Sequence, residues 1–128
     1  MTTDEVRGFF EALSSSRFDE IEAWLHEDVV LEFPGRRFGG RHAGRRRVLV
    51  FLRSNQRLFR SGLRFTVQWT ATADGRTIAQ WTNQGTTRDG TEYENRGVTI
   101  FHVSDGQVTE IQDYLDTERI AHTWPRAD

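Results

Sequence analysis

The residue best suited to chemistry is an aspartate near the end of the chain. In the alternating segment 108–115, Asp113 falls on the same face as Ile111 and Leu115. A carboxylate between two aliphatic side chains lies either at a strand end in water or in a cavity. In a cavity, desolvation raises its pKa, which suits a general acid or base. The alternative is a partly exposed aspartate that binds a neighbouring arginine or backbone group.

Other polar and aromatic residues are candidates for the wall of such a pocket. Glu32, in a strand-like segment over residues 29–33, could add a second carboxylate or face solvent. Asn55 interrupts the apolar side of a helix expected after Gly44, and a buried amide must find partners. Further candidates for contacts with a ligand are Thr82, Gln84, Asn95, Thr99, Phe33, Phe51, Phe101 and Leu115. For the four polar members of that set, the alternative is an outward, solvated face of a sheet.

Several classes of site are excluded or disfavoured by residue type and spacing. The chain has no cysteine, which excludes disulfides, thiolate nucleophiles and cysteine-bound zinc. Its four histidines, at positions 26, 42, 102 and 122, lack metal-ligand spacing such as H-x-x-x-H. The segment GRRFGG, residues 35–40, is not followed by the G-K-[ST] of a phosphate-binding loop. We therefore expect neither a metal nor a cofactor.

Basic residues are concentrated in one part of the chain. Residues 35–64 carry ten arginines and no acidic residue, although the whole chain has a formal net charge of −2. This segment could be a solvated surface, could attract an anionic substrate such as a carboxylate or a carrier-bound acyl chain, or could bind nucleic acid. Nucleic-acid-binding domains are usually basic overall. We therefore expect a small molecule, and not nucleic acid, as the partner.

The first half of the chain has helical periodicity. The apolar residues of 6–13 recur at helical spacing, and Thr2 with Glu5 forms a capping-box pattern. Ser16 with Asp19 is expected to cap a second, short helix, and the segment 29–33 is expected to be a strand. A long amphipathic helix is expected after Gly44, with one side formed by Arg46, Arg53, Arg57 and Arg60.

The second half has the pattern of an antiparallel meander. Asp-Gly pairs begin at residues 74, 89 and 105, and this dipeptide is typical of hairpin turns. Between them lie alternating segments at 65–71, 78–87, 93–103 and 108–115. Helices followed by a meander predict the α+β class. The length fits one domain over residues 1–128, and the lack of a long apolar run or a leader-like N-terminus favours a cytoplasmic location without a membrane span.

The stretch QWTNQGTTRDGTEYENRGVTIFHVSDGQVTEIQDYLDTERI, residues 80–120, resembles the SnoaL-like branch of the nuclear transport factor two-like superfamily. Its ending, DGQVTEIQDYLDT, has the turn, strand and Asp-Tyr-x-Asp of that branch, and HEDVVLEFPG is similar to the first strand. The resemblance implies a cone-shaped α+β barrel. In such a barrel, N-terminal helices pack on a curved, mostly antiparallel sheet that encloses a pocket. The resemblance also implies frequent homodimers.

The known sites of this superfamily are only partly present. Ketosteroid isomerases use a tyrosine and two aspartates at positions that match Phe9, Phe33 and Thr99 here, so that set is absent. Limonene-type epoxide hydrolases use five polar residues, and the matching positions are Val30, Glu32, Gln80, Thr82 and Asp113. Only the aspartate is kept. SnoaL-type cyclases rely on a pocket aspartate as acid or base, and Asp113 fits that role.

These observations lead to one expected function and one alternative. The first is a cofactor-independent cyclase, isomerase or dehydratase that acts on a small, mostly apolar carbonyl compound, as in natural-product biosynthesis. Asp113 and Glu32 would be the catalytic residues. The alternative is a non-catalytic ligand-binding or assembly protein with the same fold. The sequence does not identify the substrate or the reaction type.

Overall fold

The helices and strands follow the expected order, with two additions. The computed structural model describes residues 1–124. The helices are α1 (Thr3–Ser14), α2 (Phe18–Trp24), α3 (Arg45–Arg57) and α4 (Thr117–Thr123). The strands are β1 (Leu25–Phe33), β2 (Gly40–Ala43), β3 (Arg64–Ala73), β4 (Arg76–Thr86), β5 (Glu92–Ser104) and β6 (Gln107–Leu115). Strand β2 and helix α4 were not expected from the sequence.

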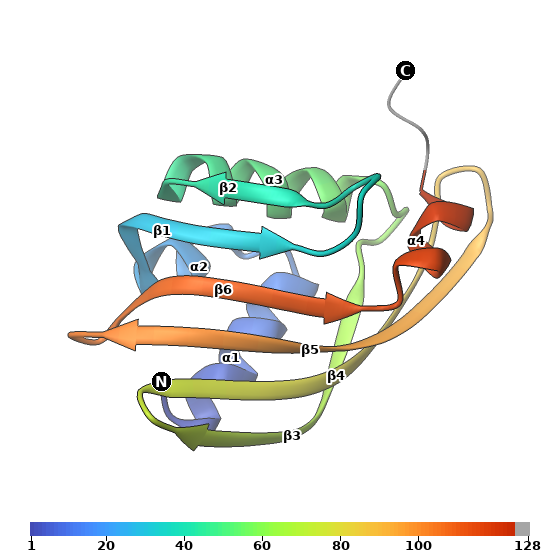
Figure 1. The fold of residues 1–128 in the computed structure, drawn as a ribbon. Helices are drawn as coiled ribbons and strands as arrows, with labels where there is room; N and C mark the ends of the chain where they lie inside the picture. The colour runs from blue at the N-terminus through green and yellow to red at the C-terminus, as the bar shows by residue number, and fades with distance from the viewer. Residues whose placement is uncertain (125–128) are drawn as a thin grey trace.

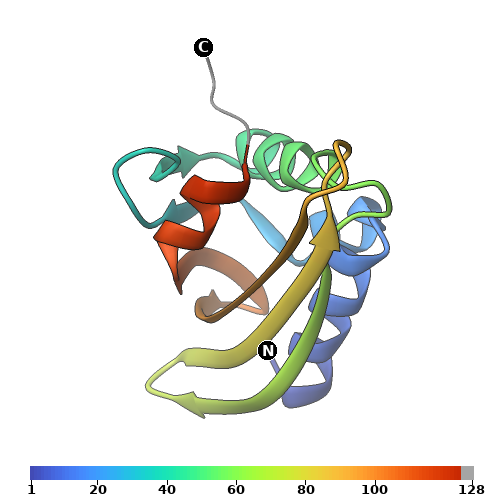
Figure 2. The same cartoon turned by 90° about the vertical axis from the view of Figure 1, so that its right-hand side faces the viewer.

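All six strands belong to one mixed sheet in the order β2-β1-β6-β5-β4-β3. Its neighbours are antiparallel except β1 and β6, which run parallel. The sheet is curved, α1, α2 and α3 lie on its concave side, and α4 lies at one end (Figures 1 and 2). The sheet does not close, since β2 and β3 remain edge strands. The α+β class and the curved, mostly antiparallel sheet are therefore confirmed.

Two of the three Asp-Gly pairs form tight hairpin turns. Asp74 and Gly75 have φ angles of 53° and 72°, and Asp105 and Gly106 have 52° and 78°. Positive φ at both central residues is the type I′ geometry that matches the twist of antiparallel strands. The pair at 89–90 instead lies in a longer connection between β4 and β5. The meander prediction is confirmed, with one loop in place of a tight turn.

The helix caps agree with the sequence for α1 and differ for α2. The Glu5 backbone N–H donates to the Thr2 hydroxyl at 3.1 Å, and the Thr2 N–H donates to the Glu5 carboxylate at 3.0 Å. For α2 the N-cap is Arg17, which makes no side-chain cap bond. Ser16 has a φ of 56° and belongs to the turn that ends α1. The expected Ser16 cap is therefore wrong, because that residue has a left-handed conformation.

The core consists of two buried clusters that share part of their surroundings. The larger lies between α1, α3 and the concave face of the sheet, and the smaller contains Phe59, Tyr93 and Trp124. Phe33 and Leu115 pack against both clusters. The two clusters are therefore in contact through these residues. The predicted single domain over residues 1–128 stays a prediction, since residues 125–128 lie outside the described part of the chain.

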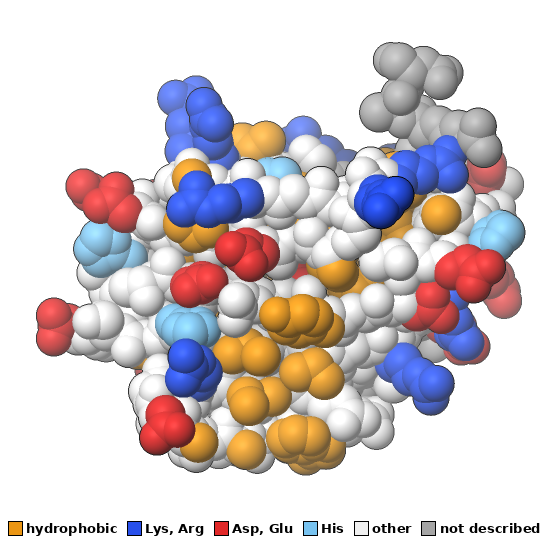
Figure 3. Space-filling view, viewed as in Figure 1, with side chains coloured by type: hydrophobic (Ala, Val, Ile, Leu, Met, Phe, Trp, Pro, Cys, Tyr) orange, Lys and Arg blue, Asp and Glu red, His pale blue; other side chains and the backbone are white. Residues whose placement is uncertain are grey.

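The convex face of the sheet carries an exposed apolar patch. Trp69 and Tyr114 are 46% and 53% exposed. The strand register places Val98 beside Tyr114, and Ile100 beside Ile78, on this same face. Figure 3 shows apolar side chains gathered over these strands. We call these five residues the outer apolar patch.

Candidate functional site

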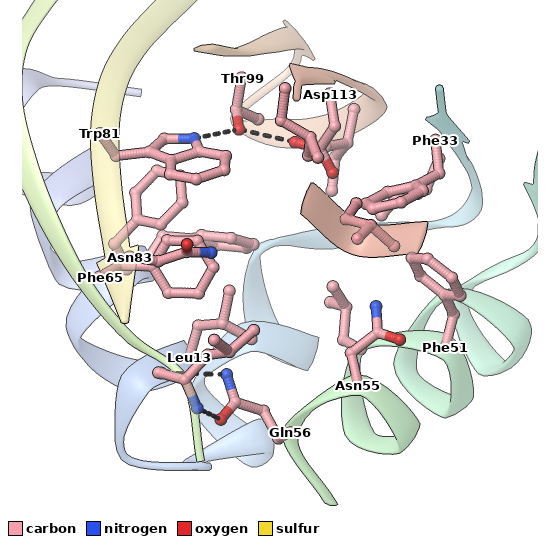
Figure 4. A pocket seen from close by; sticks show the side chains of 18 of the residues that line it. Leu13, Phe33, Phe51, Asn55, Gln56, Phe65, Trp81, Asn83, Thr99 and Asp113 are labelled. Carbon is pink, nitrogen blue, oxygen red and sulfur yellow. Dashed lines mark hydrogen bonds between the residues drawn. The ribbon is translucent and has the colours of Figure 1, made fainter. Parts of the chain in front are cut away.

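A cavity lies between the concave face of the sheet and the helices (Figure 4). Its volume is about 60 Å³, whereas one water molecule needs roughly 10–15 Å³ on this measure. Most of the wall is apolar, with contributions from α1, α3, β1 and β6. Trp124, directly after α4, completes the wall and stacks on Phe33 with ring centroids 5.9 Å apart. The cavity is thus a small, mainly apolar space with few polar groups.

Asp113 places its carboxyl group in this cavity from β6 (Figure 4). Thr99 is its register partner on β5, and the Thr99 hydroxyl donates to Asp113 Oδ1 at 2.6 Å. Burial raises the pKa of Asp113 to about 6, although the hydrogen bond from Thr99 acts in the opposite direction. Both protonation states of this carboxyl are therefore accessible near neutral pH, as acid–base chemistry requires.

A chain of hydrogen bonds orients the Asp113 carboxylate. Trp81 Nε1 donates to the Thr99 hydroxyl oxygen at 2.8 Å. Because that oxygen accepts from the indole, the only hydroxyl proton of Thr99 is left for Asp113 Oδ1. No hydrogen bond from residues 1–124 reaches the other carboxylate oxygen, Oδ2. One oxygen is therefore held in place while the other is available to a ligand.

A glycine on β5 leaves the space that the Trp81 ring needs to form this hydrogen-bond chain. Gly97 is the register partner of Trp81. A Cβ atom at position 97 would lie 2.8 Å from two carbons of the indole ring and 2.6 Å from the Tyr114 backbone oxygen. Only glycine therefore lets the Trp81 ring lie across β5 and reach Thr99.

Two asparagines supply amide groups to the cavity wall. Asn55 comes from α3 and Asn83 from β4 (Figure 4). Asn83 Oδ1 is buried and has no hydrogen-bond partner within residues 1–124. A buried polar atom without a partner is costly, so a ligand or water in the cavity would stabilise it. Gln56, next to Asn55 on α3, differs, because its amide nitrogen and oxygen each form a hydrogen bond with the Leu63 backbone.

Tyr93 adds a hydroxyl group to the wall. Asn95 Nδ2 donates to the Tyr93 hydroxyl oxygen at 2.8 Å and to the Asp116 backbone oxygen at 2.9 Å. Burial raises the pKa of Tyr93, so its phenol is neutral at physiological pH. Since its oxygen accepts from Asn95, the hydroxyl proton can be donated to a ligand.

Six of the predicted site residues lie in the wall of this cavity. Besides Asp113, the cavity is lined by Asn55, Thr99, Phe33, Phe51 and Leu115. The sequence analysis did not identify Asn83 and Tyr93, which also line the cavity. Asn83 could have been found, because it alternates with the aromatic Trp81 on the inner face of β4.

Five of the predicted site residues do not line the cavity. Glu32 is exposed on β1, since its neighbours Leu31 and Phe33 point inward, so its carboxylate does not enter the site. Thr82 and Gln84 are exposed on the convex face of β4. Asn95 supports Tyr93 from outside the wall. Phe101 is fully buried in the core, where its ring packs edge-on against Phe9.

No histidine of residues 1–124 is among the side chains that line this cavity. His42, on β2, stacks on Phe51 with ring centroids 4.1 Å apart and does not line the cavity. Burial lowers the pKa of His42. Within residues 1–124, no group of three His, Asp or Glu side chains is placed to hold a metal ion. In the same residues, no helix is both long and apolar enough to span a membrane.

Comparison with known proteins identifies the fold and one family. The family model of the SnoaL-like domain matches residues 6–111. No curated protein matches the chain significantly.

Three solved structures show how closely the fold is shared. Bal32a, from a soil-derived mobile gene cassette, is 19% identical over 95% of both chains, with a TM-score of 0.87. A protein of Jannaschia sp. CCS1, provisionally named a SnoaL-like polyketide cyclase, is 16% identical over 94% of this chain and 88% of its own, with a TM-score of 0.81. An LEH-like epoxide hydrolase of M. tuberculosis is 24% identical over 92% of this chain and 84% of its own, with a TM-score of 0.75. At these identities the similarity shows the fold alone.

Proposed function

The chain belongs to the SnoaL-like domain family, and we propose that it is a small-molecule enzyme whose Asp113 carboxylate removes a proton next to a carbonyl group. The observation that carries this proposal is Asp113 itself. It is a carboxylate in an apolar cavity, with a pKa raised to about 6 and one oxygen held by Thr99. The names of two structural neighbours, a polyketide cyclase and an epoxide hydrolase, support small-molecule chemistry in this fold.

The proposed reaction begins with Asp113 as a base. With a pKa of about 6, its carboxyl is mainly ionised at pH 7. The carboxylate takes a proton from the carbon next to the carbonyl, and the C–H electron pair moves into an enolate. The amide of Asn83 or Asn55, or the hydroxyl of Tyr93, would donate to the enolate oxygen.

The reaction type depends on where the proton goes next. Protonated Asp113 returns it to a different carbon in an isomerisation. In a cyclisation the enolate carbon attacks a second carbonyl, and Asp113 protonates the new alkoxide. In a dehydration the proton leaves with a β-hydroxyl group as water. All three share the first step, so a test of proton removal covers them together.

The cavity wall favours a small, mostly apolar carbonyl compound. We propose that Phe33, Phe51 and Leu115 contact its apolar part, while Asn55 and Thr99 border its polar part. Exclusion of water by these side chains strengthens electrostatic interactions with the enolate. The volume of about 60 Å³ restricts the unperturbed cavity to compact molecules.

Wild-type protein is expected to accelerate the exchange of the α-protons of cyclohexanone in D₂O. Cyclohexanone is a compact ketone without charge, and its α-protons exchange only after they are removed by a base. The rate of deuterium uptake is measured by mass spectrometry against buffer of the same pH and carboxylate concentration. Exchange at the buffer rate for cyclohexanone and 2-cyclohexenone would contradict the proposed reaction.

A non-catalytic ligand-binding protein is the second candidate. The observation in its favour is that, within residues 1–124, Asp113 is the only carboxylate that lines the cavity. The corresponding prediction is that small ketones bind without accelerated exchange and that binding survives the loss of the carboxylate. The same exchange experiment, combined with a binding measurement, separates the two candidates.

We also propose that the protein is a homodimer that buries the outer apolar patch. Native mass spectrometry is expected to show twice the chain mass. Ile100→Glu would place two like charges in one symmetric interface and is expected to raise the dimer Kd by roughly 100-fold or more. Val50→Glu is the matched control, since Val50 is 53% exposed on α3, away from the patch. A monomeric wild-type protein, or equal effects of both variants, would contradict this interface.

A further inference from the structure

Four arginines surround a hollow on the outer side of α3, away from the Asp113 carboxyl. Arg53 and Arg57 come from α3, Arg60 from the loop after it, and Arg88 from the connection between β4 and β5. The hollow has a volume of about 370 Å³, and no acidic residue of the described part of the chain lines it. We call it the arginine groove. Arg46, which the sequence grouped with these residues, lies outside it.

Three of the four arginine side chains, those of Arg53, Arg60 and Arg88, are held in place by neutral partners. Arg88 Nε donates to the Arg57 backbone oxygen at 2.7 Å, and Arg60 Nη2 donates to the Arg88 backbone oxygen at 3.4 Å. The Arg53 guanidinium lies over the Phe18 ring, 5.0 Å from its centroid. These contacts join the β4–β5 connection to the end of α3 and pre-position the groups, yet they neutralise none of the positive charges.

No ion pair within residues 1–124 involves these four arginines. The ion pairs that arginines form in this part of the chain involve Arg17 and Arg119, which do not line the groove. Asp89, next to Arg88, instead accepts hydrogen bonds from Thr87 and Thr91, which lower the pKa of Asp89. Four like charges around one hollow repel each other, and a bound anion would relieve that repulsion.

We propose that the arginine groove binds a phosphate group carried by a small molecule. Guanidinium groups match phosphate oxygens in charge and in bidentate geometry. The groove is compact, and Glu92 and Glu94 line the adjoining hollow beyond Arg60. A phosphate backbone that continued past the groove would meet these acids, and the net charge of −2 adds no long-range attraction. A small phosphorylated ligand therefore fits better than a nucleic acid, and this holds whatever reaction occurs in the cavity.

The test is a calorimetric titration of the full chain with inorganic pyrophosphate. Saturable binding of one pyrophosphate per chain is expected, and it should weaken as NaCl screens the charges. Arg57→Glu combined with Arg88→Glu is expected to lower the affinity at least about tenfold, because the variant loses two guanidinium groups that can form charge-assisted hydrogen bonds to the phosphate oxygens. Arg46→Glu is the matched control, since it lies about 16 Å along the helix from Arg57 and should leave the affinity unchanged.

Two kinds of result would overturn the proposal. The first is that pyrophosphate shows no saturable binding at low salt, or that Arg46→Glu lowers the affinity as much as the double variant does. The other is a single-stranded oligonucleotide that binds more tightly than pyrophosphate and loses affinity in the double variant, which would assign the groove to nucleic acid. The replaced side chains are exposed, so circular dichroism should show folded variants. If the double variant is unfolded, Arg53→Gln and Arg57→Gln test the same point without charge reversal.

Discussion

Asp113→Asn is expected to lower the exchange of cyclohexanone α-protons by about 10²–10⁴-fold while the protein remains folded. The amide oxygen of asparagine can still accept the hydrogen bond from Thr99, so the contact between Trp81 and Thr99 is preserved. The amide cannot take up a proton from carbon, however. Initial exchange rates are compared at pH 8, where the wild-type carboxyl, with its pKa of about 6, is ionised.

The control for this experiment is another carboxylate on the same sheet. Glu32→Gln removes an exposed side chain of β1 that does not line the cavity, so the exchange rate should equal that of the wild type. The wild-type rate is also expected to rise with pH and level off above about 6, the pKa of Asp113. An Asp113→Asn variant that exchanges protons at the wild-type rate would exclude Asp113 as the base.

The sequence located Asp113 because side chains alternate between the two faces of β6, so that Asp113 shares a face with the apolar residues two positions to either side of it. Ile111 and Leu115 define the inner face of that strand, and Asp113 lies between them in the sequence and in the cavity wall. On β4 the same alternation places Trp81 and Asn83 inward, whereas the sequence assigned its polar wall to Thr82 and Gln84. Polarity was the misleading signal there, since a solvated convex face is also polar.

The residues of β1 alone do not predict which face of the sheet Glu32 occupies. Val30 and Leu31 are both apolar, so the segment gives no clean alternation, and only the structure shows that Leu31 is the inner one. The parallel pairing of Leu31 with Ile111 joins segments eighty residues apart. Such long-range pairing leaves no local pattern in a single sequence.

The sequence also did not predict helix α4, which is followed by the cavity residue Trp124. Helix α4 has seven residues and one buried side chain, Ile120, which is too little for a periodic pattern. Its N-terminus is fixed by Asp116, whose carboxylate accepts from the Glu118 and Arg119 backbone N–H groups. The two aspartates of the DYLD segment therefore differ in role, because Asp113 enters the cavity and Asp116 caps the helix beside it.

The wild-type protein is expected to lose stability relative to Asp113→Asn as the pH rises. Burial raises the folded-state pKa of Asp113 from 3.8 to about 6, so between these values the folded state binds more protons than the unfolded state. The free energy of unfolding must then fall with increasing pH. The total loss is about 3 kcal/mol, complete slightly above pH 6, since each unit of pKa shift corresponds to about 1.4 kcal/mol.

Urea denaturation between pH 4 and pH 8 gives the free energy of unfolding of both proteins. Subtracting one free energy from the other removes the contribution of titrating groups common to both, such as His42. The two proteins should differ least near pH 4, and Asp113→Asn should be the more stable by up to about 3 kcal/mol above pH 7. Parallel curves would mean that the Asp113 carboxyl is solvated and lacks the raised pKa on which the proposed base depends. The proposed use of Asp113 in proton transfer would account for a charge that destabilises the folded state at neutral pH and yet is oriented by Thr99 and Trp81. The stability curve therefore tests the physical premise of the proposed reaction without knowledge of the substrate.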